Sequence, residues 1–420
     1  MLFVSATSTT TTSNGVEQQS NNNNNNSSSN NETIDKLRIL EFFSGIGGMY
    51  YSTLISGIPF EVLQSFDINT NANDVYNYNI SSKYPNPKKH KVNSKSIDAL
   101  TTKELESFRA NTWLMSPPCQ PFTRVGLQKD LQDNRTNSFV HLLEQLAALA
   151  EPPTYILIEN VYGFEKSNAR DLLLETFNQL QYQFQEFHLT PTQFGLPNQR
   201  LRYFCIAKKV LLNNDSNNNS NSNIDIKTKI VTKDNAIILK TIPSYQHTEN
   251  NETNTIEQYL DESYNTDEHY YKYKIPEKLL LSKGMLFDIK TINDKTTNCF
   301  TKAYSKFVEG TGSVLQLDTN YKADINVPNS LIPMKLRYFS PKEITRFHFF
   351  PEQFQFPPSV TVAQGYRLIG NSLNCKIVSE LLKYLFYKFN DDNNNNNNNS
   401  NDNDNNASCS SGNSNNNNNE

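Results

Sequence analysis

Short apolar runs alternate with helix-length segments along the first half of the chain. These runs are rich in β-branched and aromatic residues and predict strands at 37–43, 61–66, 112–115, 155–158, around 184 and at 203–207. Amphipathic stretches predict helices from 72 onward, at 139–149 and at 172–180. Strands separated by helices favour a parallel, doubly wound α/β sheet of the Rossmann-like type, in which ligands bind beyond the carboxyl ends of the strands.

The pattern changes beyond position 210, where the chain is irregular and rich in tyrosine up to position 333. Regular patterning returns at Ser340-Pro341, an N-cap followed by a proline at the first helical position. A final helix is predicted at 374–387, and we expect it to pack back on the first domain. The predicted divisions are a tail at 1–35, an α/β domain at 36–210, a smaller domain at 211–335, a return to the α/β domain at 336–390 and a tail at 391–420.

Composition and charge limit which parts of the chain fold and what they bind. The tails and the insertion at 213–223 consist almost wholly of polar residues. They contain too few apolar residues to offset the entropy of ordering, so we expect them to be disordered. The formal net charge is -4, so a nucleic-acid partner would need a local basic surface. The lysine-rich loop at 83–95 is one candidate, and a merely solvated charged loop is an equal alternative.

Cysteine usage and hydropathy bear on the compartment. The 5 cysteines have no paired spacing, which indicates a reducing compartment and argues against a disulfide framework or a bound metal. The first residues make a poor signal peptide, and no apolar run approaches the roughly 20 residues of a membrane span. We therefore expect a soluble, intracellular monomer without a membrane partner, in the cytoplasm or the nucleus.

Two features at predicted strand ends indicate a nucleoside cofactor. The run Ser44-Gly45-Ile46-Gly47-Gly48 follows the first strand, and glycine lets the backbone approach a ligand closely because it has no Cβ. Asp67 ends the second strand, where an acidic residue accepts hydrogen bonds from ribose hydroxyls. A tight turn with a surface aspartate explains these residues about equally well. A dinucleotide is disfavoured because the phosphate-binding GxGxxG pattern is absent.

A second group of residues carries candidate chemistry. Cys119 follows Pro117-Pro118 after the third strand, and this rigid loop suits a nucleophile. Glu159 ends the buried fourth strand, where burial raises a carboxyl pKa and favours acid chemistry. Arg200 and Arg202 share one face of a starting strand and suit polar edges or phosphates. Each has a structural alternative: a buried apolar cysteine, a loop carboxylate or a charged strand end.

In this order along the chain, the motifs resemble the DNA/RNA cytosine-5 methyltransferase family. The resemblance covers 37–209 and 296–390. The motifs that carry it are the glycine loop (first motif), Pro117-Pro118-Cys119-Gln120 (catalytic), Glu159-Asn160-Val161 (acid), Gln199-Arg200-Leu201-Arg202 (eighth) and Gly370-Asn371-Ser372 (tenth). Ser96-Ile97 departs from many relatives, which place an acid before the adenine-contacting residue, but one subgroup of the family tolerates a hydroxyl there.

That subgroup is Dnmt2, whose signature resembles Cys299-Phe300-Thr301 with Tyr304 and 310–313, while 337–343 fits its ninth motif. Its members look like DNA methyltransferases but chiefly methylate transfer RNA, at a cytosine in the anticodon loop of tRNA-Asp. The resemblance therefore implies tRNA as the substrate, with DNA as the alternative. It also implies an S-adenosylmethionine-dependent methyltransferase domain and a target-recognition domain at 211–335.

The resemblance assigns roles to individual residues. Cys119 is implied as the nucleophile toward carbon 6 of a flipped cytosine, with Glu159 as the acid at N3, Arg202 as a donor to O2 and Arg200 as its support. The implied cofactor-binding residues are Ile46, Gly47, Gly48, Asp67, Ser96, Ile97, Ser116, Asn371 and Ser372. The implied substrate-binding residues are Gln120, Cys299, Phe300 and Thr301.

Two other classes of protein fit less well. A catalytically silent nucleic-acid binder would be expected to have lost its nucleophile or acid, yet Cys119, Glu159 and both arginines are present. A methyltransferase for small molecules would not need the Pro-Pro-Cys-Gln loop.

Overall fold

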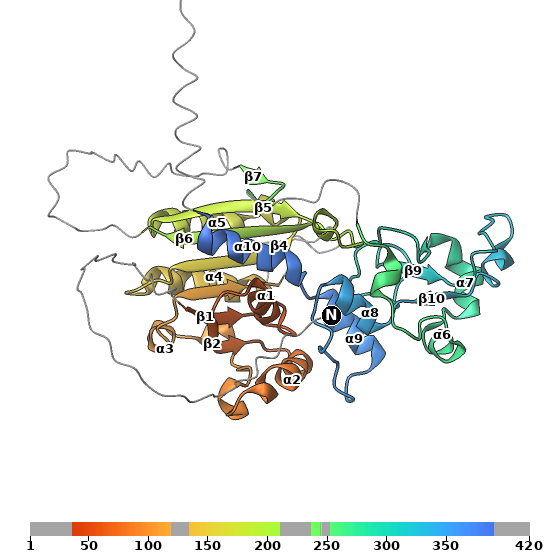
Figure 1. The fold of residues 1–420 in the computed structure, drawn as a ribbon. Helices are drawn as coiled ribbons and strands as arrows, with labels where there is room; N and C mark the ends of the chain where they lie inside the picture. The colour runs from red at the N-terminus through yellow and green to blue at the C-terminus, as the bar shows by residue number, and fades with distance from the viewer. Residues whose placement is uncertain (1–35, 119–133, 211–236, 244, 246–252, 390–420) are drawn as a thin grey trace, which may run out of the picture. The chain divides into compact units, whose positions relative to one another are not determined.

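The computed structural model describes residues 36–118, 134–210, 237–243, 245 and 253–389, which belong to one compact unit (Figure 1). Both tails and the insertion at 213–223 lie outside the described residues, as do Cys119 and Gln120.

Among the described residues, the larger sheet has seven strands in the order β2-β1-β3-β4-β6-β5-β7. Their bounds are β1 (Leu37–Phe42), β2 (Phe60–Phe66), β3 (Thr112–Met115), β4 (Tyr155–Val161), β5 (Tyr182–Leu189), β6 (Arg202–Lys209) and β7 (Ile238–Leu239). β1 lies between β2 and β3 and runs parallel to both. The chain passes outward from β1 to β2 and then returns to β3, so the strand order reverses at β1, where ligands bind in such sheets.

Strand β6 departs from the parallel sheet that the sequence predicts. It runs antiparallel to both of its neighbours, β4 and β5. A parallel neighbour needs a long crossover, usually a helix. The connection from β5 to β6 instead contains only the short 3-10 helix Pro191–Phe194 and a left-handed turn at Gly195. The predicted fold class is confirmed, and the expected parallel pairing is wrong for this strand.

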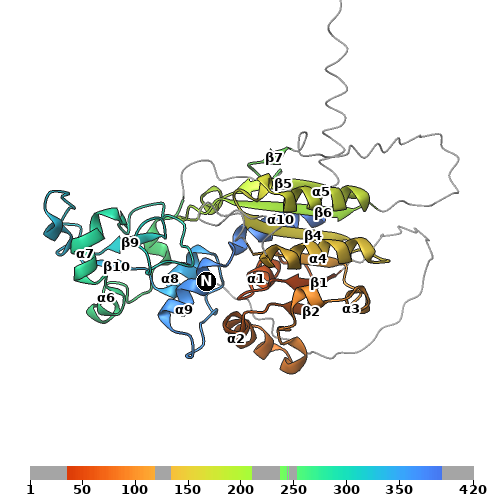
Figure 2. The same ribbon diagram turned by 180° about the vertical axis from the view of Figure 1, so that it is seen from behind.

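Helices cover both faces of the larger sheet (Figures 1 and 2). On one face α1 (Gly48–Ser56) packs against α10 (Cys375–Tyr387), so the final helix does return to this sheet. On the other face α4 (Asn134–Ala148) packs against α5 (Asn168–Gln179), over a separate apolar cluster. The strands contribute side chains to both clusters because successive side chains point to opposite faces of the sheet. None of the described helices is long and apolar enough to cross a membrane.

Local capping fixes where several helices begin. Ser340 and Glu343 form a capping box at α8 (Pro341–Phe347), at the start that the sequence predicts. Asn69 caps α2 (Thr70–Asn79), which begins slightly before the expected position. Helix α9 (Val362–Gly370) was not predicted, although the capping box of Thr361 and Gln364 marks its start.

A second sheet has the order β10-β9-β8. The elements of this region are β8 (Asp288–Lys290), β9 (Ser313–Gln316), β10 (Leu336–Tyr338), α6 (Asp267–Tyr273) and α7 (Glu277–Lys283). The short helix α3 (Thr102–Ser107) belongs to the region of the larger sheet. The elements of the second sheet's region, apart from β10, lie in the segment 211–335 that the sequence suggests as a smaller domain, whereas β10 lies just beyond it, in the segment predicted to return to the α/β domain. The domain boundaries themselves stay a prediction.

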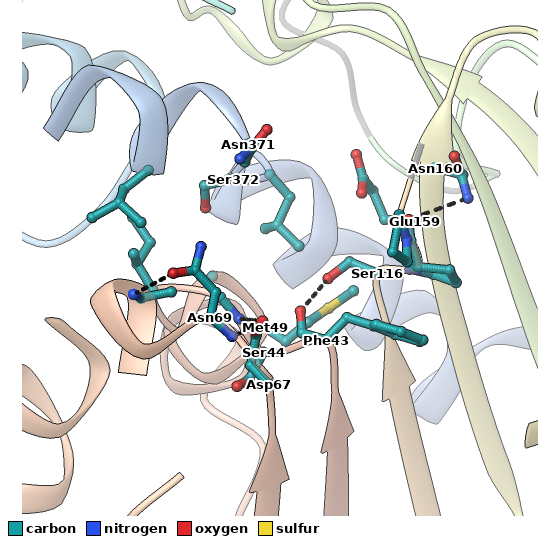
Figure 3. Close-up of a pocket in the computed structure, with 18 of the residues that line it drawn as sticks. Phe43, Ser44, Met49, Asp67, Asn69, Ser116, Glu159, Asn160, Asn371 and Ser372 are labelled. Atoms are coloured by element: carbon teal, nitrogen blue, oxygen red, sulfur yellow. Dashed lines mark hydrogen bonds between the residues drawn. The ribbon is translucent and has the colours of Figure 1, made fainter. Parts of the chain in front are cut away.

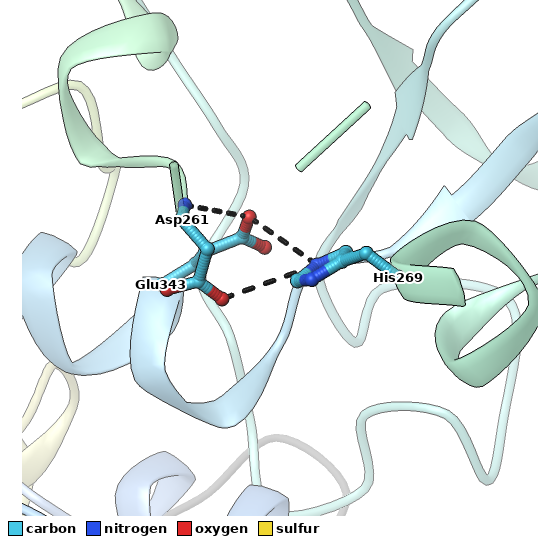
Figure 4. Close-up of side chains that lie close together, drawn as sticks. All are labelled: Asp261, His269 and Glu343. Atoms are coloured by element: carbon cyan, nitrogen blue, oxygen red, sulfur yellow. Dashed lines mark hydrogen bonds and ion pairs between the residues drawn. The ribbon is translucent and has the colours of Figure 1, made fainter. Parts of the chain in front are cut away.

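A buried polar cluster joins β10, α6 and α8 (Figure 4). The Arg337 guanidinium donates to both carboxylate oxygens of Glu343 at 2.8 Å, and both side chains are fully buried. Asp261 accepts from Arg346 at 2.7 Å, and its backbone N–H donates to Glu343. The His269 Nε2 atom lies 3.8 Å from Glu343 and 3.9 Å from Asp261. Because arginines already occupy both carboxylates, we interpret the cluster as a structural network.

Candidate active site

A cavity of about 530 Å³ lies beyond the carboxyl ends of the parallel strands (Figure 3). Glu159 and Asn160 stand on β4 at one side, and Asp67 and Asn69 follow β2 at the other (Figure 3). Of the residues predicted from the sequence, its wall contains Ile46, Gly48, Asp67, Ser96, Ile97, Ser116, Glu159, Arg200, Arg202, Asn371 and Ser372. The topology thus brings together side chains that are more than 300 positions apart in the chain, as from Ile46 to Ser372.

The glycine loop connects β1 to α1. Gly47 has a φ of +93°, and a Cβ there would lie 2.5 Å from the Ile80 side chain, so this glycine lets the loop pack against the end of α2. Gly47 is not part of the cavity wall, whereas its neighbours Ile46 and Gly48 are. The structure therefore places Gly47 behind the site, where it shapes the loop.

Asp67 is held in a fixed orientation. One carboxylate oxygen accepts from the Gly45 N–H and the other from the Asn69 N–H, each at 2.8 Å. Burial raises the pKa of Asp67, and these hydrogen bonds oppose the rise. The carboxylate is an acceptor at the point where the sequence predicts contact with a cofactor hydroxyl.

The segment after Ser96 forms another part of the wall. Ile97 is buried and begins the short 3-10 helix Ile97–Ala99. The Ser96 hydroxyl donates to the Asp98 carboxylate, and this hydrogen bond is the main reason that the pKa of Asp98 is lowered. Asp98 also lines the cavity. An acid is therefore present here, two positions after the site where many family members carry one before the adenine-contacting residue.

The segment that leads to Cys119 starts inside the cavity wall. Ser116 donates its hydroxyl to the Phe43 carbonyl at 3.0 Å (Figure 3). Pro117 and Pro118 line the cavity, and the Asn160 amide donates to the Pro117 carbonyl at 3.5 Å. The described chain thus ends at the cavity one residue before the predicted nucleophile, which itself lies outside the described residues.

Glu159 has the electrostatic environment of a carboxyl group that can retain a proton. Its side chain is only 12% exposed, and its Oε1 lies 3.6 Å from the Arg202 Nε. Burial raises the pKa of Glu159, while the charges of Arg202 and Arg200 oppose that rise. The balance leaves the pKa above its ordinary value, as the sequence predicts for an acid at the exit of a buried strand.

Arg200 is buried and forms hydrogen bonds with two separate segments of the chain. It donates to the Phe300 carbonyl at 2.9 Å and the Gly370 carbonyl at 3.1 Å, and also to the Ser372 carbonyl. The Cys299 sulfur lies 3.3 Å from the same guanidinium. These bonds connect the segment just before β6 to two distant segments, and they agree with a supporting position for Arg200.

The fold does not place the predicted substrate-binding residues 299–301 in the cavity wall. Phe300 is fully buried and stacks on Phe347 at 5.6 Å, so its side chain belongs to the core. Burial alone would raise the pKa of the Cys299 thiol, but the Arg200 and Arg202 charges outweigh it and lower the pKa. None of Cys299, Phe300 and Thr301 is part of the described cavity wall. The next residue, Lys302, lines the cavity instead.

Sequence reasoning missed several residues of the wall, namely Asn69, Asp98, Asn160 and Lys302. Asn160 stands inside the recognised acid motif, and Lys302 directly follows the recognised signature, so position in those motifs could have indicated both. Asn69 has the sequence signal of an N-cap. No local signal distinguishes Asp98.

A family model described as C-5 cytosine-specific DNA methylase matches residues 37–387. The chain belongs to this family. A Dictyostelium discoideum member named DNA (cytosine-5)-methyltransferase is 57% identical over 84% of this chain and 95% of its own length. A human member named tRNA (cytosine(38)-C(5))-methyltransferase is 38% identical over 84% of this chain and 100% of its own length.

Solved structures of this methylase family agree. The crystal structure of the S. pombe Dnmt2 methyltransferase matches with a TM-score of 0.66 and 31% identity, over 85% of this chain and 100% of that one. The Entamoeba histolytica methyltransferase EhMeth matches with a TM-score of 0.68 and 34% identity, over 84% of this chain and 98% of that one. The methyltransferase fold and the family resemblance predicted from the sequence are confirmed.

Proposed function

We propose that this protein transfers a methyl group from S-adenosylmethionine to carbon 5 of a cytosine in the anticodon loop of tRNA, with tRNA-Asp as the expected substrate, through a covalent adduct of Cys119. The observation that carries the proposal is the placement of Glu159, with its raised pKa, in one cavity with Arg202 and the loop that leads to Cys119. Similarity to human, bovine and fission yeast proteins named tRNA (cytosine(38)-C(5))-methyltransferases supports RNA. The name of the Dictyostelium relative supports DNA as the alternative.

The half of the cavity near the glycine loop fits a nucleoside cofactor. Gly48 offers bare backbone, Asp67 a fixed carboxylate, and Ile68 and Ile97 an apolar surface for a base. Ile68 is 69% exposed, as expected for an apolar side chain that a ligand covers. The volume of about 530 Å³ is typical of small-molecule sites. When bound, S-adenosylmethionine supplies an electrophilic methyl group.

The other half of the cavity suits activation of a cytosine ring. In the proposed reaction the Cys119 thiolate forms a bond to carbon 6, and the displaced electron pair makes carbon 5 nucleophilic. Glu159 gives its proton to N3 as negative charge develops there, and Arg202 donates to O2. After carbon 5 has gained the methyl group, N3 returns its proton to Glu159, and a base removes the proton from carbon 5. The carbon 6–sulfur bond then breaks and returns the thiolate.

Replacement of the nucleophile tests this reaction. Cys119→Ala should abolish transfer of labelled methyl to tRNA while affinity for S-adenosylmethionine, measured by calorimetry, stays within about two-fold, because the other residues of the wall hold the cofactor. Cys205→Ala is the matched control, since Cys205 is fully buried in β6. Undiminished transfer by Cys119→Ala would refute the proposal.

Two further measurements separate the alternatives. RNA that carries 5-fluorocytidine should form a denaturation-resistant adduct with the wild-type protein and none with Cys119→Ala, because fluorine cannot leave as a proton does. Labelled-methyl incorporation into purified tRNA and into genomic DNA should favour tRNA. Faster cytosine-specific incorporation into DNA would reverse the choice of substrate.

A further inference from the structure

The loop that starts at Lys302 forms part of the cavity wall and has no role in the reaction above. Lys302 is exposed and lines the cavity. Within the part of the chain that the structure describes, no carboxylate forms an ion pair with it. The segment from Lys302 to Phe307 carries two lysines and no acidic residue. A positive charge is therefore presented at the site with no ion-pair partner among the residues that the structure describes.

The backbone of this loop is held in place from both sides. The Thr301 N–H donates to the Thr311 carbonyl at 3.0 Å, which closes the loop at its base. A Cβ on Gly370 would lie 2.3 Å from the Thr301 carbonyl carbon, so the loop lies directly against the end of α9. Tyr304 is buried and donates its hydroxyl to the Ser313 carbonyl at 2.6 Å. The backbone of this loop therefore loses little further freedom on binding.

Phe307 points away from the core that its neighbours fill. Its side chain is 59% exposed, whereas Tyr304 and Val308 are buried. The Lys306 ammonium lies 5.5 Å from the Phe307 ring centre. The Thr311 hydroxyl donates to the Phe307 carbonyl at 2.7 Å and fixes this position. An exposed aromatic ring with a lysine beside it is a combination with which proteins stack the bases of single-stranded nucleic acids and hold their phosphates.

We propose that the loop 302–307 binds the RNA strand beside the target cytosine, with Lys302 at a backbone phosphate and Phe307 stacked on a neighbouring unpaired base. This inference rests on the proposed function, because it requires an RNA loop as the substrate. The observation behind it is the hydrogen-bonded loop at the cavity, which presents an exposed phenylalanine and a lysine that pairs with none of the described carboxylates. Phosphate contacts position the strand, while the base edges carry sequence information.

Steady-state kinetics on a tRNA transcript, with the full chain, test the lysine. Lys302→Ala should raise KM for tRNA about 10-fold, leave kcat within about two-fold and lower the slope of log KM against log salt by about 0.7 to 0.9. Lys302→Arg should restore most of the affinity. The matched control is Lys388→Ala: Lys388 ends α10, whose Phe386 packs on Tyr155 at the amino end of β4, opposite the cavity. The control should behave as wild type.

Substitutions of the phenylalanine separate stacking from apolar area. Phe307→Ala should raise KM for tRNA about 5- to 100-fold, and Phe307→Leu should do the same because it lacks a ring, whereas Phe307→Trp should keep the wild-type value. Tyr387→Ala is the matched aromatic control, since Tyr387 is 51% exposed on α10. Full activity of Phe307→Leu would overturn the stacking role.

The possible failures can be told apart. If the wild-type protein methylates tRNA and both Lys302→Ala and Phe307→Ala retain their KM, only this inference falls. If the wild-type protein methylates duplex DNA and not tRNA, the proposed substrate falls as well. If Lys302→Ala weakens binding of S-adenosylmethionine instead of tRNA, Lys302 belongs to the cofactor site and the inference is wrong.

Discussion

At the scale of single residues, the proposed role of Glu159 requires a specific electrostatic environment. A carboxyl group can protonate N3 of a base only if it holds a proton near neutral pH. Burial in β4 favours the neutral form, and Arg202, 3.6 Å away, limits the effect. The pair thus keeps the pKa raised without losing the carboxylate that must form after proton transfer.

A pH profile tests this arrangement. Because the pKa of Glu159 is raised, its protonated fraction falls only as pH rises through that raised value, so kcat/KM for tRNA should have an alkaline limb that belongs to this group. Glu159→Gln should lower kcat about 10²- to 10⁴-fold, keep the KM for tRNA and remove the limb. Unchanged turnover by Glu159→Gln would reject the role of the acid.

Residue-scale expectations succeeded where a side chain's position follows from its strand. Asp67 directly follows β2 and Glu159 lies near the carboxyl end of β4, so both reach the cavity. They failed where neighbours along the chain point in different directions. Phe300 is in the core and Lys302 is at the cavity, although both belong to the same short loop. Sequence spacing could not decide which of them faces the substrate.

At the scale of elements, the end of α9 and the loop at 301–302 form a contact that only glycine permits. A Cβ on Gly370 would lie 2.3 Å from the Thr301 carbonyl carbon and 2.4 Å from the Lys302 nitrogen. Backbone atoms cannot move aside as a flexible side chain can, so the two elements would have to separate. Arg200, which donates to the carbonyls of Phe300 and Gly370, bridges the same two elements.

Gly370→Ala should therefore destabilise the protein by about 1 to 3 kcal/mol, as overpacking typically does. It should also lower kcat/KM for tRNA at temperatures where the variant is folded, because Arg200 and Lys302 shift together. Urea unfolding and kinetics measure the two effects. Gly310→Ala is the control: φ is +68° with open space around it, so it should cost about 1 to 2 kcal/mol without loss of activity. Full activity of Gly370→Ala would contradict this account.

At the scale of the whole molecule, buried histidines connect stability to pH. His348 is fully buried, and burial lowers its pKa well below the ordinary 6.5, with Arg200 and Arg202 adding to the effect. Burial also lowers the pKa of His269, and Arg337 adds to the decrease. The folded protein therefore disfavours the protonated form of both rings, whereas in the unfolded chain they bind protons below pH 6.5.

The direction in which pH changes the stability follows from proton binding. Below pH 6.5 the unfolded state binds more protons than the folded state, so the free energy of unfolding should fall as pH falls, by up to about 1.4 kcal/mol per pH unit for His348. Urea unfolding between pH 7.5 and 5.5 measures the decrease. His348→Phe keeps a ring but cannot titrate, so its stability should depend less on pH in this range. An equal dependence in both proteins would contradict the prediction.

The sequence by itself determined strands β1 to β6 of the larger sheet, most of its helices and the order of the motifs at the strand ends, but not β7, which lies in the segment predicted as the smaller domain. These depend on local periodicity and on capping residues such as Ser340 and Asn374, which act within a few positions of the chain. The tertiary structure alone decided that β6 runs antiparallel and that Arg200 holds the segments at 300 and 370–372 together. The Arg200 contacts join positions 100 or more residues apart, and the pairing of β6 with β4 joins positions 41 to 53 residues apart, so both depend on how the elements pack.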